Sequence, residues 1–416
     1  MKLLLMFSVA FTLGCGNDVR SPPLDSDPAG EPVYYGQVER IMRDNCVECH
    51  STDPDRLAPF SLATFKDAFD AADTAPISFA VNNRTMPPYF ATNDGECQDL
   101  HGTKWLTEEE IGILTAWTNG QHLEGNPADT VAPLPPPAAL PEVNKTLDIG
   151  ANYTPDATRD DDYRCFVVPA LGANAFLTGV HVRPTNFKVA HHVILYTLDS
   201  AASQQEVEQR DLMDSGPGYN CNDGVSDVGA SFLTGWAPGQ GATVFPAGTG
   251  VPVDGTRKLV IQLHYNLANS DGRPDHTVID LDLAATVTSP AQIVSVRGDV
   301  DLDWGKADAI ATGTRALVLP GTLTSARVWG AMMHMHNRGT GGELIVERSA
   351  NSCLLDLAGW SFHWQHFYWY SDPLRVNRDE TLRVTCHYDT TGDTARVTWG
   401  EGTEQEMCLA YLYISR

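Results

Sequence analysis

A CxxCH motif near the amino-terminal end carries a clear cofactor signal: Cys46, Cys49 and His50. Two thiols at this spacing can add to the two vinyl groups of one haem, and the adjacent histidine is placed to bind the iron axially. Met86 is the predicted distal ligand, because the proline pair after it holds the loop extended and a thioether raises the haem potential. The motif therefore predicts one c-type haem, in preference to a zinc or redox CxxC site.

A second group of candidate ligands lies in the rest of the chain: His191, His192, His264, His334, His336 and Met407. Residues i and i+2 of a strand project to one face, so His334 and His336 can bind one metal together. The adjacent residues His191 and His192 point to opposite faces of a regular strand, so they need a strand end or a bulge to converge on one ion. Neutral imidazoles suit copper, zinc or iron, and a thioether beside two imidazoles favours copper. Each histidine taken alone is more often structural, so the prediction rests on their order in one chain.

The elements around the CxxCH motif are expected to be helical. Residues 38–46 have an amphipathic pattern, and Thr107 followed by three acidic residues predicts the capped start of a helix through Trp117. We assign residues 34–125 to a small all-α cytochrome c domain of class-I type. Residues 126–146, which are rich in proline, then form a stiff linker.

The remainder of the chain has the pattern of antiparallel β structure. Short alternating runs are separated by Gly, Pro, Asp and Asn, which is typical of β-sandwiches, and the one expected helix is the polar stretch 202–213. The length suits two sandwich or jelly-roll-like domains in series, residues 147–285 and 286–416. The predicted fold class is therefore multidomain, with a small all-α domain followed by two all-β domains.

The amino-terminal residues have the pattern of a bacterial lipoprotein signal. Lys2 precedes an apolar run that ends at Gly14-Cys15. Residues 1–15 would be the signal, Cys15 the lipidated residue and 16–33 a flexible tether; the alternative is an ordinary secretory signal with an incidental cysteine. The expected location is the bacterial cell envelope, periplasmic or on the surface, or else outside the cell, and disulfides are permitted in each.

Composition narrows the range of partners. The 416 residues suit two or three domains, and 28 basic against 53 acidic residues give a formal charge of −25, which disfavours nucleic acid. No run of about 20 apolar residues follows the amino-terminal segment, so we expect membrane attachment through the lipid alone.

Residues 147–416 resemble the copper type II, ascorbate-dependent monooxygenases, the family of peptidylglycine alpha-hydroxylating monooxygenase and dopamine beta-monooxygenase. The resemblance rests on five segments in one order: Tyr163-Arg164-Cys165-Phe166, the His191-His192 pair, Gln262-Leu263-His264-Tyr265, His334-Met335-His336 and Glu406-Met407-Cys408. The CxxCH region lies outside it.

This resemblance implies two copper ions in different domains. An electron-supplying copper would be held by His191, His192 and His264, and a copper that binds oxygen and substrate by His334, His336 and Met407. It also implies O2 as co-substrate and ascorbate as electron donor, and the fused haem suggests that a cytochrome, or a redox partner protein, supplies electrons instead or as well. The implied disulfides are Cys165–Cys221 and Cys386–Cys408, while Cys97 and Cys353 stay unassigned.

The sequence departs from the family at the expected substrate site. Met332 stands where the peptide-amidating enzymes have a carboxylate-binding arginine, and Leu409 replaces an asparagine, although Tyr411 is retained. Burying a carboxylate in an uncharged site is costly, so the predicted substrate is a small molecule without a carboxylate. The aromatic segment 360–370 either walls a pocket for an apolar or aromatic molecule or forms a strand with large core residues; its His363 and His366 are structural or line the site.

Three functions remain open from sequence. The first is a copper monooxygenase that hydroxylates a C–H bond with O2, with electrons relayed through the haem. The second is a non-catalytic envelope protein that carries electrons or binds copper. The third is an adhesive β-sandwich lipoprotein in which the histidines are incidental.

Overall fold

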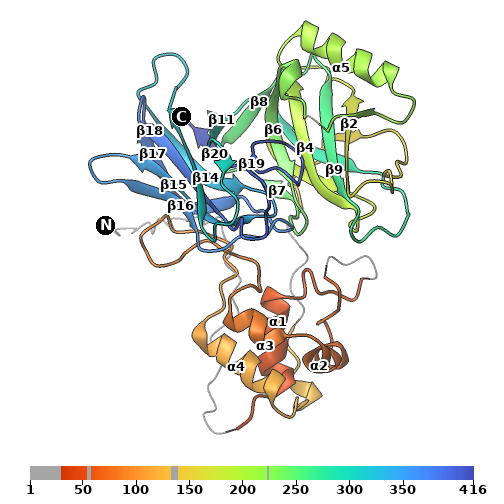
Figure 1. The fold of residues 1–416 in the computed structure, drawn as a ribbon, viewed down its shortest axis with the longest axis vertical. Coiled ribbons are helices and arrows are strands. Elements are labelled where there is room, and N and C mark those ends of the chain that lie inside the picture. Colours follow the sequence, from red (N-terminus) through yellow and green to blue (C-terminus); the bar gives the residue numbers. More distant parts are fainter. Residues whose placement is uncertain (1–29, 54–57, 133–138, 223) are drawn as a thin grey trace, which may run out of the picture.

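A computed structural model describes residues 30–53, 58–132, 139–222 and 224–416 of the chain. Three bodies are visible in Figure 1: a helical region at the bottom and two β domains above it. The predicted signal, Cys15 and most of the predicted tether lie outside the described residues, as do the central prolines of the linker. Among the described residues, no helix has both the length and the apolar character needed to cross a membrane.

The helical region has its own apolar core. Its helices are the π-helical turn η1 (Tyr34–Val38), α1 (Glu39–Asn45), α2 (Phe65–Thr74), α3 (Ile77–Asn82) and α4 (Glu108–Asn119). Buried side chains from these helices, among them Tyr34, Ile41 and Trp117, pack in one cluster. The predicted cap of α4 is confirmed as a capping box between Thr107 and Glu110. Helices α2 and α3 were not predicted; they are short, with 10 and 6 residues.

The first β domain consists of two facing sheets. One has the strand order β5-β2-β9-β4-β6, and the other begins β1-β10-β3-β8, with β7 paired to β3. Helix α5 (Ala201–Met213) matches the predicted polar helix and begins at a Ser200 cap. The strands are β1 Lys145–Asp148, β2 Asp161–Val168, β3 Ala175–Arg183, β4 Ala190–Leu198, β5 Tyr219–Asn220, β6 Ala230–Trp236, β7 Thr243–Val244, β8 Thr249–Val253, β9 Leu259–Asn266 and β10 Val278–Ala284; the short 3-10 turns are η2 Pro127–Asp129 and η3 Ser226–Val228.

The second β domain has the same two-layer plan. Strands β11-β20-β14-β17 face the sheet β13-β18-β15-β16, and β12 pairs with β19. The strands are β11 Ser289–Arg297, β12 Asp301–Leu302, β13 Ala309–Ala316, β14 Ser325–His334, β15 Gly339–Glu347, β16 Ser352–Leu357, β17 Tyr368–Asn377, β18 Thr381–Tyr388, β19 Val397–Thr398 and β20 Leu409–Ser415. The prediction of all-β structure after the linker is confirmed.

The two β domains share one sheet. Strand β8 of the first domain pairs in parallel with β11 of the second, at Thr249 opposite Ser289 and Gly250 opposite Pro290. This pairing joins the half-sheets into one sheet of nine strands. The sequence predicted two sandwiches in series; the shared sheet adds a fixed junction between them, because main-chain hydrogen bonds link the halves.

The helical region is fastened to the second β domain through its loop before α4. Cys97 forms a disulfide with Cys353, and the loop makes isolated β-bridges from Ala91 to Leu357 and from Leu100 to Tyr370. Tyr89, Ala91, Leu100 and Trp105 pack against the core of the second β domain. A covalent bond, main-chain pairing and apolar burial therefore hold the helical region in place.

Candidate metal centres

The first histidine cluster lies where β4 and β9 run side by side. His192 is opposite His264 in the antiparallel pair, and the register is irregular between Ala190 and His192. His191 lies at this irregularity, so the side chains of the two adjacent histidines can turn to one side of the strand, as a shared metal site requires. Ligand atoms of His191, His192 and His264 all lie within 4.8 Å of one another.

The donor atoms of this cluster suit a bound ion. The Nδ1 atoms of His191 and His264 are 3.4 Å apart. Two imidazole nitrogens at about 2.0–2.1 Å from one tetrahedral ion, the distance typical of zinc, are separated by about 3.3–3.4 Å. The Nε2 atom of His192 is buried without a hydrogen-bond partner. A metal would supply the interaction that these nitrogens lack.

A carboxylate orients His264 from the side away from the cluster. Asp161 Oδ1 lies 2.8 Å from His264 Nε2, and the Tyr163 ring stacks on the imidazole at 4.1 Å. Burial raises the pKa of Asp161, but hydrogen bonds from His264 and Thr403 outweigh it and hold this pKa at about 2. The ionised Asp161 fixes the His264 tautomer that presents Nδ1 to a metal, an arrangement common around metal-binding histidines.

The second cluster forms where β14 ends beside the start of β20. His334 is opposite Leu409 in the antiparallel register, which places Met407 beside His336 just beyond the paired strands. The rings of His334 and His336 are 5.2 Å apart, and His334 and Met407 line the same cavity. The HxH pair and the late methionine therefore come together.

Each histidine of this second cluster has a fixed tautomer. His334 Nδ1 lies 2.6 Å from Gln365 Oε1, and the Gln365 amide nitrogen donates to the Phe362 carbonyl, which sets the amide orientation. His336 Nδ1 lies 3.0 Å from the Gln405 carbonyl. In both rings Nδ1–H donates, so Nε2 carries the lone pair that a metal requires.

Glu406 holds the methionine segment against the HxH segment. Its buried carboxylate accepts hydrogen bonds from the backbone N–H groups of His336 at 2.8 Å, Arg338 at 2.7 Å and Met407 at 3.3 Å. Burial raises the pKa of Glu406 to about 7 in spite of these bonds. The neighbouring disulfide Cys386–Cys408 ties the same segment to β18.

The two clusters meet at the boundary between the β domains. The rings of His192 and His334 are 5.8 Å apart, and Phe362 lies within 5.9 Å of both His191 and His192. Burial lowers the pKa of His334 to about 4 and of His336 to about 3, and it lowers the pKa values of His191 and His192 still more clearly. All four imidazoles are thus neutral at neutral pH, which is the form that binds metals.

A cavity of about 530 Å³ opens between the β domains beside both clusters. It includes the three positions predicted for substrate contact, Met332, Leu409 and Tyr411. Its walls are rich in aromatic rings, including Phe232, Trp236, Phe245, Phe367, Trp369 and Trp399. Both alternatives for the segment 360–370 hold in part, because Phe367 and Trp369 line this cavity while Tyr368 and Tyr370 are buried in the core.

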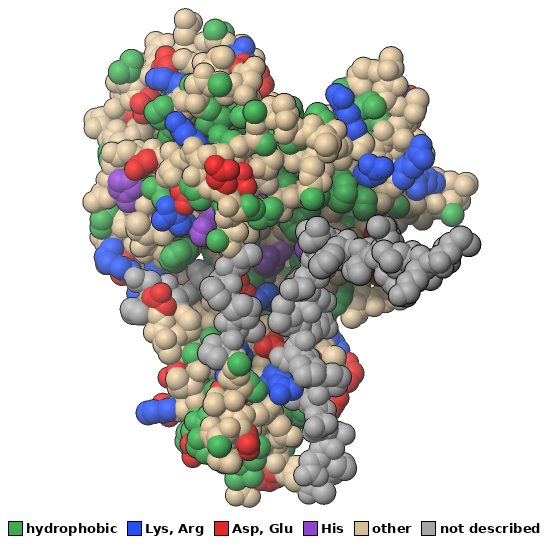
Figure 2. All heavy atoms as spheres, turned by 180° about the vertical axis from the view of Figure 1, so that it is seen from behind, with side chains coloured by type: hydrophobic (Ala, Val, Ile, Leu, Met, Phe, Trp, Pro, Cys, Tyr) green, Lys and Arg blue, Asp and Glu red, His purple; other side chains and the backbone are tan. Residues whose placement is uncertain are grey.

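A second cavity, of about 440 Å³, lies between the helical region and the β domains. Cys46, Cys49, His50 and Met86 line it, so the structure brings the predicted haem ligands together. His50 Nδ1 lies 3.0 Å from the Phe60 carbonyl, which fixes the tautomer with the Nε2 lone pair. Figure 2 shows histidine side chains at the level where the helical region meets the β domains.

The two thiols of the motif are free and border an apolar cavity. Cys46 and Cys49 are not joined in a disulfide, and burial raises the pKa of each to about 12. Neutral thiols on an apolar cavity fit covalent attachment to a haem.

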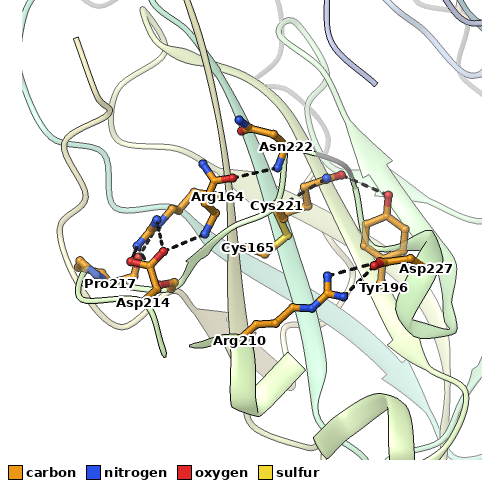
Figure 3. Close-up of a disulfide and its surroundings, with 12 residues drawn as sticks. Arg164, Cys165, Tyr196, Arg210, Asp214, Pro217, Cys221, Asn222 and Asp227 are labelled. Atoms are coloured by element: carbon orange, nitrogen blue, oxygen red, sulfur yellow. Dashed lines mark hydrogen bonds and ion pairs between the residues drawn. A yellow bond between two sulfur atoms is a disulfide. The ribbon is translucent and has the colours of Figure 1, made fainter. Parts of the chain in front are cut away.

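Three disulfides are present among the described residues. Cys165–Cys221 and Cys386–Cys408 are the implied pairs, and Cys97–Cys353 is the pair that sequence left unassigned. Beside the first of these, Arg164 forms a two-pronged ion pair with Asp214 (Figure 3). Disulfides persist in oxidising compartments, so they indicate an extracytoplasmic protein.

The comparisons with known proteins agree with this geometry. Residues 317–414 match the model of the "Copper type II ascorbate-dependent monooxygenase, C-terminal domain". The matched region contains His334, His336 and Met407. Tyramine beta-hydroxylase of Caenorhabditis briggsae is 22% identical over 80% of this chain and 58% of its own length, and dopamine beta-hydroxylase of Rattus norvegicus is 23% identical over 76% and 54%.

The chain therefore spans little more than half the length of these curated relatives. Among solved structures, the major capsid protein P2 from Bacteriophage PM2 aligns over 65% of this chain and 96% of that chain. Its TM-score of 0.23 and identity of 10% are too low to indicate a shared fold.

Several residues that shape the two clusters were missed by sequence reasoning. Asp161, Gln365 and Glu406 orient candidate ligands from other segments of the chain. Asp161 is the first residue of β2 and belongs to no sequence motif. Glu406 lies in the methionine segment, but its sequence position indicates no role. Their common signal is a polar residue inside an otherwise apolar strand or beside a ligand.

Proposed function

We propose that this protein is a copper-dependent monooxygenase that hydroxylates a C–H bond of a small molecule. The observation that carries the proposal is that six widely spaced ligand residues converge as two neighbouring clusters, of which His192, His334 and Met407 line one interdomain cavity. His191, His192 and His264 would hold the electron-supplying copper, and His334, His336 and Met407 the copper next to the substrate. Copper at the second cluster would supply activation of O2, and a soft methionine ligand favours the Cu(I) state that must meet oxygen.

The remaining residues of the site bind and orient the substrate. The cavity beside His334 presents aromatic rings together with Met332 and Leu409, and the Phe232 and Tyr411 rings stack at 4.7 Å. Arg297, the cation on this wall, lies 3.5 Å over the Trp399 ring. An apolar or aromatic molecule without a carboxylate would fit these walls, because burying a carboxylate needs a dedicated partner.

A c-type haem is the proposed source of electrons. Cys46 and Cys49 would attach it, and His50 and Met86, which line the same cavity, would bind its iron. A haem in this cavity would supply one-electron transfer, fed by ascorbate or by a partner protein. Met86 is 46% exposed and lines this cavity, where a bound porphyrin would cover it. We place the protein in the bacterial cell envelope, anchored through Cys15.

Metal analysis and oxygen uptake test the proposal. The full chain, matured with haem and copper in an oxidising compartment, should contain two coppers and one haem iron. The reduced protein should consume O2 when a panel of uncharged aromatic molecules is added, and mass spectrometry should find the hydroxylated product. His334→Ala should abolish product. The control His276→Ala should not, because His276 is a partly exposed histidine that bonds Asp148 and Asn152 and belongs to neither cluster. A copper content near zero would reject the proposal. Two coppers per chain without any hydroxylated product would indicate a non-catalytic protein that carries electrons or binds copper.

A further inference from the structure

His363 makes a contact that the proposed copper and haem ligand sets do not include. It belongs to the segment between β16 and β17 of the second β domain, yet its Nδ1 atom lies 3.0 Å from Nε2 of His191 in the first β domain. The two rings meet edge to face, with centroids 5.1 Å apart. His191 therefore uses both ring nitrogens: Nε2 faces His363, and Nδ1 faces His264 at 3.4 Å.

This contact completes a pattern among the candidate ligands. One ring nitrogen of each histidine has a hydrogen-bond partner. The partner is Asp161 for His264, Gln365 for His334 and a backbone carbonyl for His336. The partner on the far nitrogen of a ligand histidine fixes its tautomer and the direction of the ring. His363 occupies that place for His191: His191 Nε2–H donates and His363 Nδ1 accepts, so His191 presents Nδ1 to the metal.

The same pair faces the cavity that contains the CxxCH motif. His191 and His363 both line that cavity, as do Cys46, Cys49 and His50. The side chain of His363 is exposed toward this space. The disulfide Cys97–Cys353 holds the helical region against the domain that carries His363. The pair is thus shared by the first histidine cluster and the haem cavity.

We propose that His363 is a positioning residue for His191, and that the His363–His191 pair is the contact through which the first cluster receives its electron. This inference rests on the proposed function. Per event, the pair passes one electron from a ferrous haem, which becomes ferric, to a copper(II), which becomes copper(I). No covalent bond forms or breaks, and the hydrogen bond between the rings keeps its proton. Ascorbate or a reduced carrier protein restores the ferrous haem.

Two substitutions separate this role from a merely structural one. His363→Leu removes the acceptor, whereas His363→Asn keeps an acceptor oxygen near the place of Nδ1. His387→Asn is the matched control, because His387 is a half-exposed histidine of the same domain that bonds Asp308 outside both cavities. All measurements use the full chain with haem and copper bound.

Copper(II) titration followed by electron paramagnetic resonance gives the first readout. His363→Leu should weaken copper binding at the first cluster by about 10- to 100-fold and alter its spectrum, while the signal of the second copper stays unchanged. His363→Asn should restore affinity and spectrum, and His387→Asn should match wild type. An unchanged affinity and spectrum in His363→Leu would overturn the positioning role.

Stopped-flow absorbance of the haem gives the second readout. With copper in excess, so that the first cluster is occupied in every variant, the oxidation of ferrous haem by copper(II) should slow at least about tenfold in His363→Leu. An unchanged rate would overturn the electron contact. If the wild-type chain lacks copper, or its haem is not oxidised by copper at all, the proposed function fails first, so the two failures are distinguishable.

Discussion

The imidazole rings of His192 and His334 lie 5.8 Å apart although the two residues belong to different β domains. Each belongs to a different candidate copper cluster, and the shared sheet between β8 and β11 fixes the domains that carry them. The arrangement places the two clusters in direct contact, with His192 and His334 both facing the aromatic cavity. An electron would therefore cross one pair of rings, without passing through a wide layer of solvent.

This closeness predicts a magnetic interaction between two bound copper(II) ions. With copper(II) bound at both clusters, the protein should give a broadened and weakened electron paramagnetic resonance spectrum. The reason is that paramagnetic ions held by neighbouring rings couple to each other. His264→Ala and His336→Ala, which each leave one cluster intact, supply the two single-site spectra. If the spectrum of the doubly loaded wild type equals the sum of those two, the clusters are separated in solution.

Asp161 should control copper affinity at the first cluster. Asp161→Asn keeps the shape but removes the charge that holds His264, so copper binding there should weaken by about 10- to 100-fold, measured by competitive titration with a chelator. The second copper should be unaffected. Thr403→Val is the control, since it keeps Asp161 ionised while removing the hydrogen bond that Thr403 donates from the second domain. Equal affinities in wild type and Asp161→Asn would show that the carboxylate has no such role.

The stability of the copper-free protein should depend on pH in a defined direction. Burial lowers the pKa of His334 to about 4 and of His336 to about 3. Between these values and the unfolded value of about 6.5, the unfolded chain binds more protons, so the free energy of unfolding should fall as pH drops from about 6.5 to 4. Glu406, whose pKa is raised to about 7, should increase the free energy of unfolding as the pH falls. The histidines with lowered pKa values outnumber it, so their effect should dominate.

Urea unfolding of the apo-protein at a series of pH values measures this effect. The double variant His334→Asn/His336→Asn should show a weaker fall over the same pH range, since two of the groups responsible are gone. An apo-protein whose stability rises as pH drops through this range would contradict the prediction. Copper should remain bound to about pH 5, because protons compete poorly for imidazoles with lowered pKa values.

Sequence order was enough to propose the candidate ligands, but it did not reveal the residues that surround them. The pairs His191-His192 and His334-Met335-His336 are local patterns, so spacing and order could identify them. Asp161 reaches its histidine only because β2 pairs with β9, a contact over about a hundred residues that no local pattern records. The disulfide partner of Cys353 could not be predicted from sequence either, because Cys97 comes close to it only where the helical region packs against the second β domain.

Removal of that third disulfide should loosen the helical region without unfolding the β domains. In Cys97→Ser/Cys353→Ser, the pairs Cys165–Cys221 and Cys386–Cys408 still brace the two β domains. Losing a native disulfide typically costs about 2–5 kcal/mol, and here the loss falls on the docking of the loop before α4. Limited proteolysis should therefore cleave this loop faster than in wild type, and electron transfer from the haem should slow. The β-bridge at Ala91 and the packing of Trp105 oppose the change, so equal cleavage rates would show that these contacts suffice to hold the helical region in place.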